Sequence, residues 1–203
     1  MNDGSFIYLY LFNQILATRY IMPNQHPFFF LSAAFTYPEQ ANIHPFFEIL
    51  ASLSADLSIE FNHQAADSTS LTDLQAEYVR LFINSPAGVP APPYASIYID
   101  NRGILLQQGH DEAMSFYQAA GLETIESSEC EDHIAFELAF IGHLIEDNRL
   151  DLLNKFINEH VLKWYPAFSQ RLQSARPCHF YQVLGQITGL CLQHILIEEK
   201  ADE

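Results

Sequence analysis

Four prolines within eight positions limit the fold of this chain more than any other feature of its sequence: Pro86, Pro90, Pro92 and Pro93. Proline fixes the backbone φ angle, lacks an N–H donor and biases the preceding residue toward extended geometry. A regular helix therefore does not continue through this stretch. We predict a stiff, non-helical connector over residues 84–103, joining two halves of the chain.

Before the connector, apolar residues recur with the three- and four-residue spacing that is typical of one buried helical face. The positions are Leu71, Leu74, Tyr78, Leu81 and Phe82. This spacing predicts a helix that ends near Asn84, and either Asp67 or Ser70 can serve as its N-cap.

Two further helices are predicted directly after the connector. The first begins near residue 110 and closes at Gly121, where a residue free to adopt positive φ can satisfy the last carbonyls. The second covers residues 131–147, and its free amides can be capped by Ser128 or by Asp132.

The last third of the chain also has helical spacing. Apolar residues predict a helix over 149–163, and Trp164, Tyr165 and Pro166 mark a corner into the next helix. The longest signal covers residues 179–198 and is wide enough for a buried central helix.

Strict alternation of apolar and polar residues occurs only in SIYID, residues 96–100. No internal repeat and no Gly/Ser-rich linker divides the chain. We therefore predict an all-α fold, with residues 1–203 forming a single compact multi-helix domain.

The charge of the chain excludes some partners. Twenty-five acidic residues against nine basic ones give a net charge of −16. This charge opposes binding to nucleic acid and to anionic membranes, and it favours a cationic peptide.

The cysteines and the N-terminal region indicate a protein that stays inside the cell. Cys130, Cys178 and Cys191 are odd in number and lack CxxC spacing, as expected in a reducing cytoplasm. The apolar run at residues 6–12 follows an acidic leader and is broken by polar residues, so we expect neither a signal peptide nor a membrane span.

The best metal-like group is formed by Glu131, Asp132, His133, Glu137 and His143. His133 and Glu137 are four residues apart and can share one helical face, so they can supply two ligands. A di-metal bundle needs similar sets on several helices, and no second Glu-x-x-His is present. The alternative is that Asp132 caps a helix and that His133 is a buried ring with a satisfied hydrogen bond.

The proline connector has another possible use. It can hold Tyr94 and Tyr98, or Tyr94 and Ser96, as one wall of a groove. The stripe at residues 78–82 would then form the opposite wall. The alternative is an ordinary loop that covers the core.

Four segments occur in a fixed order: YVRLF at 78–82, PAPPYASIYID at 90–100, EDH at 131–133 and HFYQVLGQITGLCL at 179–192. Together they resemble the TorD/DmsD family of cytoplasmic redox-enzyme maturation chaperones, and most of all its DmsD-like branch, over roughly residues 71–197.

The resemblance implies an all-helical, non-catalytic chaperone. It would bind the twin-arginine signal peptide of a molybdenum-cofactor oxidoreductase of the DMSO or TMAO reductase type and hold it until cofactor insertion, before Tat export. The alternatives are an adaptor that binds the body of a molybdoenzyme subunit and, less favoured, a metal-dependent enzyme.

The resemblance also implies a set of leader-binding residues. They are Tyr78, Leu81, Phe82, Pro92, Pro93, Tyr94, Ser96, Tyr98, Asp132 and His133. Tyrosines stand at three of these positions where tryptophan is frequent in the family. Cys130 replaces a proline that often precedes the Asp-His pair.

The resemblance implies no catalytic residue, no metal and no required cofactor. It implies GTP or molybdopterin binding only weakly, because the sequence has no phosphate loop. The expected partners are the leader and components of the Tat translocon, and the chain is expected to be a monomer or homodimer in the cytoplasm.

A twin-arginine leader has two guanidinium groups followed by an apolar segment. We expect Asp132, with Glu131, to engage the cationic part, and the rings near Phe82 and Tyr94 to cover the apolar part. His133 can either orient Asp132 or contact the leader. Several apolar contacts then set the affinity, and the acidic residues set the register.

Overall fold

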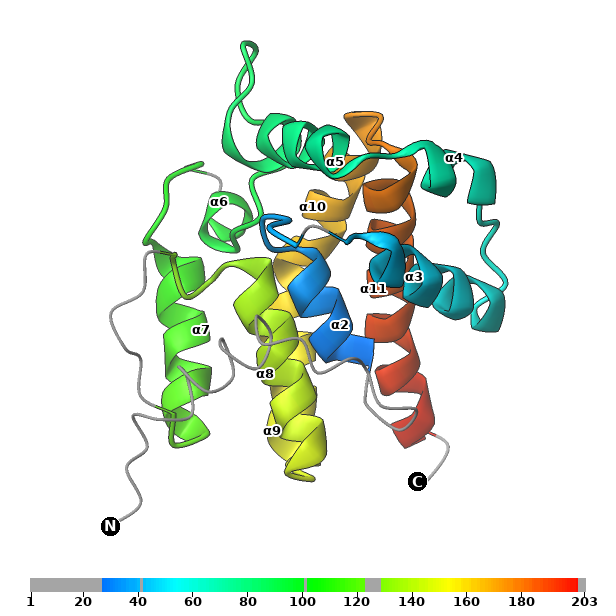
Figure 1. Ribbon diagram of the computed structural model, residues 1–203. Helices are drawn as coiled ribbons and strands as arrows, with labels where there is room; N and C mark the ends of the chain where they lie inside the picture. The colour runs from blue at the N-terminus through cyan, green and yellow to red at the C-terminus, as the bar shows by residue number, and fades with distance from the viewer. Residues whose placement is uncertain (1–26, 41, 101, 123–128, 201–203) are drawn as a thin grey trace. The chain divides into compact units, whose positions relative to one another are not determined.

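The computed structural model describes residues 27–40, 42–100, 102–122 and 129–200, except the side chains of 196–200. Two predictions, the apolar run at 6–12 and a cap at Ser128, lie outside these residues. All regular elements of the described chain are helices, which confirms the all-α prediction (Figure 1).

The chain forms two compact units, which are described separately. The first comprises the residues up to Thr36 and Tyr94–Trp164, and the second comprises Tyr37–Pro93 and the residues from Tyr165 onward. A single domain over residues 1–203 stays a prediction.

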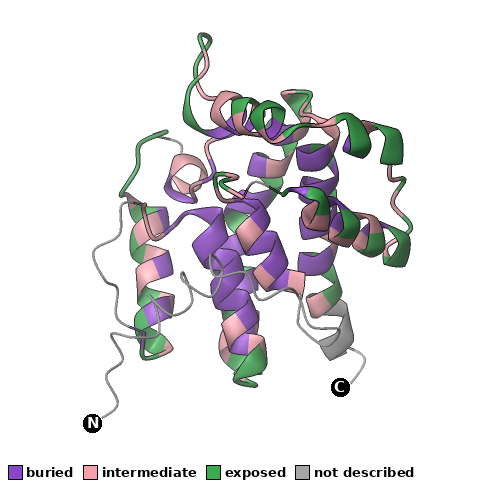
Figure 2. Cartoon of the chain, in the orientation of Figure 1, coloured by how far each residue is buried: buried purple, intermediate pink, exposed green. Residues whose placement is uncertain are grey.

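The described helices of the first unit surround one central helix. They are α2 (Pro27–Ala34), α6 (Ser96–Ile99), α7 (Gln108–Ala119), α8 (Ile134–Glu146), α9 (Leu150–Phe156), the π-helix η2 (Ile157–Val161) and the start of α10 (Leu162–Ser174). Helix α8 packs against α2 and α9, and it is buried on nearly every side (Figure 2). A helix that is apolar all round is typical of such a central position.

Two contacts fix α2 on α8. Ser32 Oγ donates a hydrogen bond to the carbonyl of Ala135 at 2.6 Å. Gly142 leaves room for Phe29, because an added Cβ would lie 2.9 Å from the ring. The buried hydroxyl is therefore satisfied, and the two helices approach closely.

The second unit contains the other described helices. They are α3 (His44–Asp56), α4 (His63–Ser68), α5 (Leu71–Tyr78), the π-helix η1 (Val79–Ile83), the rest of α10 and α11 (His179–Lys200). Helix α11 packs against α3 and α4 (Figure 1). Helix α5 begins with a capping box between Ser70 and Asp73, so Ser70 and not Asp67 is the N-cap.

The proline segment in the second unit is held by polar contacts. Arg171 donates to the carbonyls of Pro90 at 2.8 Å and Val89 at 3.0 Å. The N–H of Ala91 donates to the carbonyl of Leu81 at 3.0 Å. These bonds support the predicted stiffness up to Pro93, whereas residues 96–99 within the predicted connector form one helical turn.

The structure corrects two predicted helix boundaries. Helix α8 begins at Ile134, and its N-cap is His133 rather than Asp132. Pro166 lies inside α10 and marks no corner. It is the fifth residue of that helix, so its missing N–H removes only the bond that would reach the carbonyl of Leu162. Gly121, in contrast, has a φ of +80°, as predicted for the end of α7.

Candidate functional site

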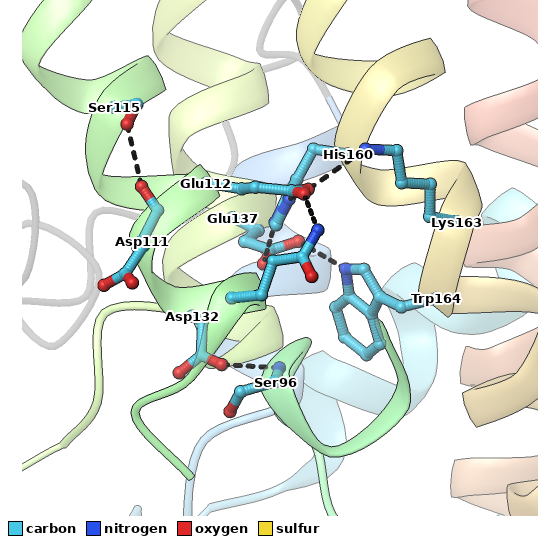
Figure 3. Close-up of polar contacts among 10 residues, drawn as sticks. Ser96, Asp111, Glu112, Ser115, Asp132, Glu137, His160, Lys163 and Trp164 are labelled. Carbon is cyan, nitrogen blue, oxygen red and sulfur yellow. Dashed lines mark hydrogen bonds and ion pairs between the residues drawn. The ribbon is translucent and has the colours of Figure 1, made fainter. Parts of the chain in front are cut away.

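The short helix α6 is fixed by the segment that precedes α8. Tyr94 and His133 form an isolated antiparallel bridge, and the N–H of Ala95 donates to the carbonyl of Asp132 at 3.0 Å. The N–H of Ser96 donates to Asp132 Oδ2 at 2.7 Å (Figure 3). A carboxylate that accepts a free amide at a helix start stabilises that start.

Asp132 is fully buried, with 0% of its surface exposed. This corrects the expectation that its carboxylate stands open beside a groove. Among the described residues, Asp132 Oδ1, His133 Nε2 and Ser96 Oγ have no hydrogen-bond partner. Buried polar atoms without partners are costly, so they mark this place as one where stability is not the only requirement.

His133 is a neutral ring in the structure. Its Nδ1 accepts the N–H of Ala135 at 3.1 Å, which caps α8. Burial lowers the pKa of His133 to about 4, against the opposing charges of Glu129 and Asp132. Of the two roles considered from the sequence, the geometry supports orientation, because the ring holds a helix start.

Two partly exposed rings flank this buried pair. Tyr94 contacts the His133 ring edge-on at 5.1 Å and donates its hydroxyl to Glu129 Oε1 at 2.7 Å. Tyr98 stacks on Trp164, with ring centroids 5.8 Å apart. Both tyrosines lie at or next to α6 and retain exposed surface.

Glu131 is another partly exposed acid at this place, and its Oε2 lies 3.1 Å from His110 Nε2. The carbonyl of Glu131 accepts the hydroxyl of Tyr117 at 2.9 Å. With Glu129, it places carboxylates beside the tyrosines. The sequence interpretation included Glu131 but missed Glu129.

Helix α7 approaches α6 more closely than any side chain allows. A Cβ added to Gly109 would lie 2.5 Å from the backbone nitrogen of Ser96. Only glycine fits at such a distance from backbone atoms. This contact, which sequence reasoning missed, fixes the second side of α6.

A polar chain runs beneath the site (Figure 3). Glu137, 1% exposed, receives hydrogen bonds from Trp164 Nε1 at 2.9 Å and from His160 Nε2 at 2.8 Å. His160 Nδ1 faces Glu112 Oε2 at 3.3 Å, and Lys163 donates to the same oxygen at 3.2 Å. An acid in the apolar stretch IAFELAF was the available signal, because a buried carboxylate needs partners.

The metal interpretation loses its ligands to this arrangement. Both oxygens of Glu137 are engaged by His160 and Trp164, and His133 Nδ1 caps α8. Among the described residues, no three His, Cys, Asp or Glu side chains gather as a metal site would require.

The remaining predicted residues belong to the second unit. Tyr78, Leu81 and Phe82 are buried at 5%, 0% and 4% exposure, so they are core residues rather than an open wall. Phe82 packs edge-on against Tyr181 at 5.2 Å. Pro92 is half-buried and Pro93 is buried.

The fold and the site together define an all-helical binding protein, with a rigid ring-bearing turn beside carboxylates. A family model described as nitrate reductase delta subunit matches residues 44–170, more than half of the chain. The chain belongs to this family, the TorD/DmsD family, as its sequence motifs predicted.

Curated relatives carry chaperone names. The chain is 33% identical over 122 residues to a Tat proofreading chaperone, DmsD, of Haemophilus influenzae, covering 60% of this chain and 59% of the relative. It is 33% identical over 121 residues to the chaperone protein TorD of Photobacterium profundum, covering 54% and 56%. The matches thus span less than two thirds of these relatives.

The fold has a counterpart among solved structures. A crystal structure described as that of a redox enzyme maturation protein from Archaeoglobus fulgidus matches with a TM-score of 0.59 and 22% identity. The match covers 83% of this chain and 97% of that one. None of the helices in the described part of the chain has the length and apolar character to cross a bilayer.

Proposed function

We propose that this protein is a cytoplasmic chaperone, without catalytic activity, that binds the twin-arginine signal peptide of a molybdenum-cofactor oxidoreductase of the DMSO or TMAO reductase type. It holds the leader until the cofactor is inserted, before Tat export. The single observation that carries this proposal is the turn of α6, which presents the partly exposed Tyr94 and Tyr98 beside Glu129. The chaperone names of the relatives support it.

In this proposal the exposed residues contact the leader and the buried ones hold them. Tyr94 and Tyr98 cover the apolar part, and Glu129 and Glu131 attract the cationic part. Asp132, His133 and Ser96 fix the turn that carries the rings. This assigns Asp132 a positioning role, in line with its burial.

The predicted residues of the second unit act differently in this proposal. Tyr78 and Phe82 form part of a buried ring cluster and so hold the π-helix η1. The carbonyl of Leu81 accepts the N–H of Ala91, which ties η1 to the proline segment. We propose that Pro92 and Pro93 then limit the freedom of the chain that leads into Tyr94.

The apolar contacts should set the affinity. Covering one large apolar side chain contributes about 1.5–3 kcal/mol, and one charge-assisted hydrogen bond contributes a similar 1.5–3 kcal/mol at most. Two or three covered side chains therefore outweigh one exposed ion pair. The carboxylates instead steer the cationic leader and fix its register.

Calorimetry with a synthetic twin-arginine leader tests the proposal. We expect Tyr98→Ala to weaken binding by about tenfold or more, as loss of a covered ring implies. Tyr37→Ala, at an exposed tyrosine of the second unit, is the matched control and should bind normally. Equal affinities of wild type, Tyr94→Ala and Tyr98→Ala would remove the proposed site.

The sequence prediction that Phe82→Ala weakens binding more than Asp132→Asn is tested in the same titration. Both side chains are buried, so unfolding curves must first establish that each variant is folded. A leader with both arginines replaced by glutamine tests the acidic residues. It should bind wild type more weakly and should be insensitive to Glu129→Gln.

One observation favours a second candidate, an adaptor for the body of a reductase subunit. The matched family model is described by a nitrate reductase subunit rather than by a leader. Binding to a mature reductase that lacks its leader, with no binding to the isolated leader peptide, would favour this candidate.

A further inference from the structure

The carboxylate of Glu137 holds a tryptophan and a histidine at once. Its Oε2 accepts Trp164 Nε1 at 2.9 Å, and its Oε1 lies 2.8 Å from His160 Nε2. The side chains of Glu137 and His160 are 1% and 0% exposed. Water therefore cannot replace either partner, and any change at His160 changes how Glu137 is stabilised.

The geometry at His160 requires a second donor. Its Nε2 faces Glu137 and its Nδ1 faces Glu112 Oε2 at 3.3 Å, so a carboxylate oxygen lies at each ring nitrogen (Figure 3). A neutral imidazole has one N–H, whereas an imidazolium has two. Only the imidazolium donates to both carboxylates, and the stacked Phe156 ring, 5.3 Å away, holds it in this orientation.

The network ends at a proposed client-binding ring. Trp164, which Glu137 anchors, is fully buried and stacks under Tyr98 with an interplanar angle of 26°. The orientation of the indole is thus fixed by one hydrogen bond on its edge, and its face supports the Tyr98 ring. A shift of the indole changes the surface that Tyr98 presents.

We propose that His160 is a positioning residue for client binding, which in its imidazolium form fixes the Tyr98 ring through Glu137 and Trp164. This inference rests on the proposed function, because it assigns Tyr98 to the leader site. It adds a pH dependence: loss of the His160 proton leaves Glu137 a buried anion without a counter-ion and loosens the support of Tyr98.

The charged groups around His160 agree on the direction of this dependence. Burial alone lowers the pKa of His160, but the carboxylates of Glu137 and Glu112 outweigh it and raise the pKa above the ordinary 6.5. Lys163, from α10, pairs with the outer carboxylate, Glu112, and not with Glu137. Asp132 adds negative charge near Glu137. The imidazolium therefore persists at neutral pH and is lost in the alkaline range.

The fluorescence of Trp164 tests the network directly, because it is the single tryptophan of the sequence. We expect wild-type emission to change in one step above pH 6.5 while circular dichroism stays native. The step should vanish in His160→Gln. It should remain in His143→Gln, whose ring contacts Asp147 at the other end of α8.

A second variant keeps the test decisive if His160→Gln does not fold. Glu112→Gln removes only the outer, partly exposed carboxylate, so the step should move to lower pH. A wild-type protein without a step, or a step unchanged in both variants, would overturn the proposed network.

Binding of a synthetic twin-arginine leader tests the link to Tyr98. His160→Gln should weaken binding by about five- to tenfold in the wild-type background, a loss on the order of one hydrogen bond. It should have no further effect in the Tyr98→Ala background. Additive losses would overturn the positioning role, whereas a wild-type protein that binds no leader would overturn the proposed function itself.

Discussion

His133 caps α8 with its own ring, because Nδ1 accepts the backbone N–H of Ala135 at 3.1 Å. An imidazole accepts a hydrogen bond at Nδ1 only when that nitrogen carries no proton. The ring is 3% exposed, and burial lowers its pKa to about 4. His133 is thus held neutral, whereas His160 has a raised pKa.

The first prediction concerns stability in acid. The unfolded chain binds a proton at His133 near pH 6.5 and the folded chain only near pH 4, so this group stabilises the fold above pH 6.5 and loses its contribution as pH falls. The loss should be about 3 kcal/mol between pH 6.5 and pH 4. Urea unfolding of wild type and His133→Asn should differ by this amount in its pH dependence. Parallel curves would contradict it.

The second prediction concerns Asp132 and the amide it accepts. Asp132→Ala leaves the buried N–H of Ser96 without its partner and should destabilise the protein by about 1–3 kcal/mol. Asp132→Asn keeps an acceptor oxygen and should cost less. Asp67→Ala, at an exposed acid of α4, is the control and should change the free energy of unfolding little. The ranking is read from urea denaturation, and equal costs for Ala and Asn would contradict it.

The third prediction compares two glycines. Gly109→Ala places a Cβ 2.5 Å from a backbone nitrogen and should destabilise the protein by about 1–3 kcal/mol. Gly142→Ala meets the Phe29 ring at 2.9 Å, which can rotate away, and alanine favours a helix. Gly142→Ala should therefore be milder in thermal unfolding. If it were the more damaging change, the close approach of α7 to α6 would not be limiting.

The fourth prediction concerns the proline segment. Arg171→Ala removes the donors to Val89 and Pro90, so limited proteolysis should cleave residues 84–90 faster. Arg171→Lys should behave similarly, because an ammonium lacks the fork that reaches both carbonyls. Both variants should unfold within about 1 kcal/mol of wild type. Lys155→Ala, exposed on α9, is the control for loss of a positive charge.

The helices could be predicted from the sequence because their signals are local. The spacing before Asn84 gave the end of the π-helix η1, Ser70 supplied a cap, and Gly121 supplied the positive φ that closes α7. Each signal acts within one or two turns of the chain. Pro166 misled for the same reason, since its local signal is compatible both with a corner and with an early position inside a helix.

The site could be predicted only in part, because its contacts join distant segments. The sequence motifs included Tyr94 and Asp132, but the partner of the Asp132 carboxylate is the amide of Ser96, 36 residues earlier. The partners of Glu137 lie 23 and 27 residues later along the chain. Residue types indicate that such groups need partners, and only the fold indicates which ones.

The π-helix η1 makes the length of the chain matter just before the proline segment. A π-turn contains one residue more than an α-turn over the same stretch. Deleting one residue between Val79 and Ile83 would restore a regular helix and turn all that follows by about 100°. The buried rings before it would keep their places, while Pro90 would no longer meet Arg171. Homologues should therefore tolerate exchange of residue types in this stretch far better than a change in their number.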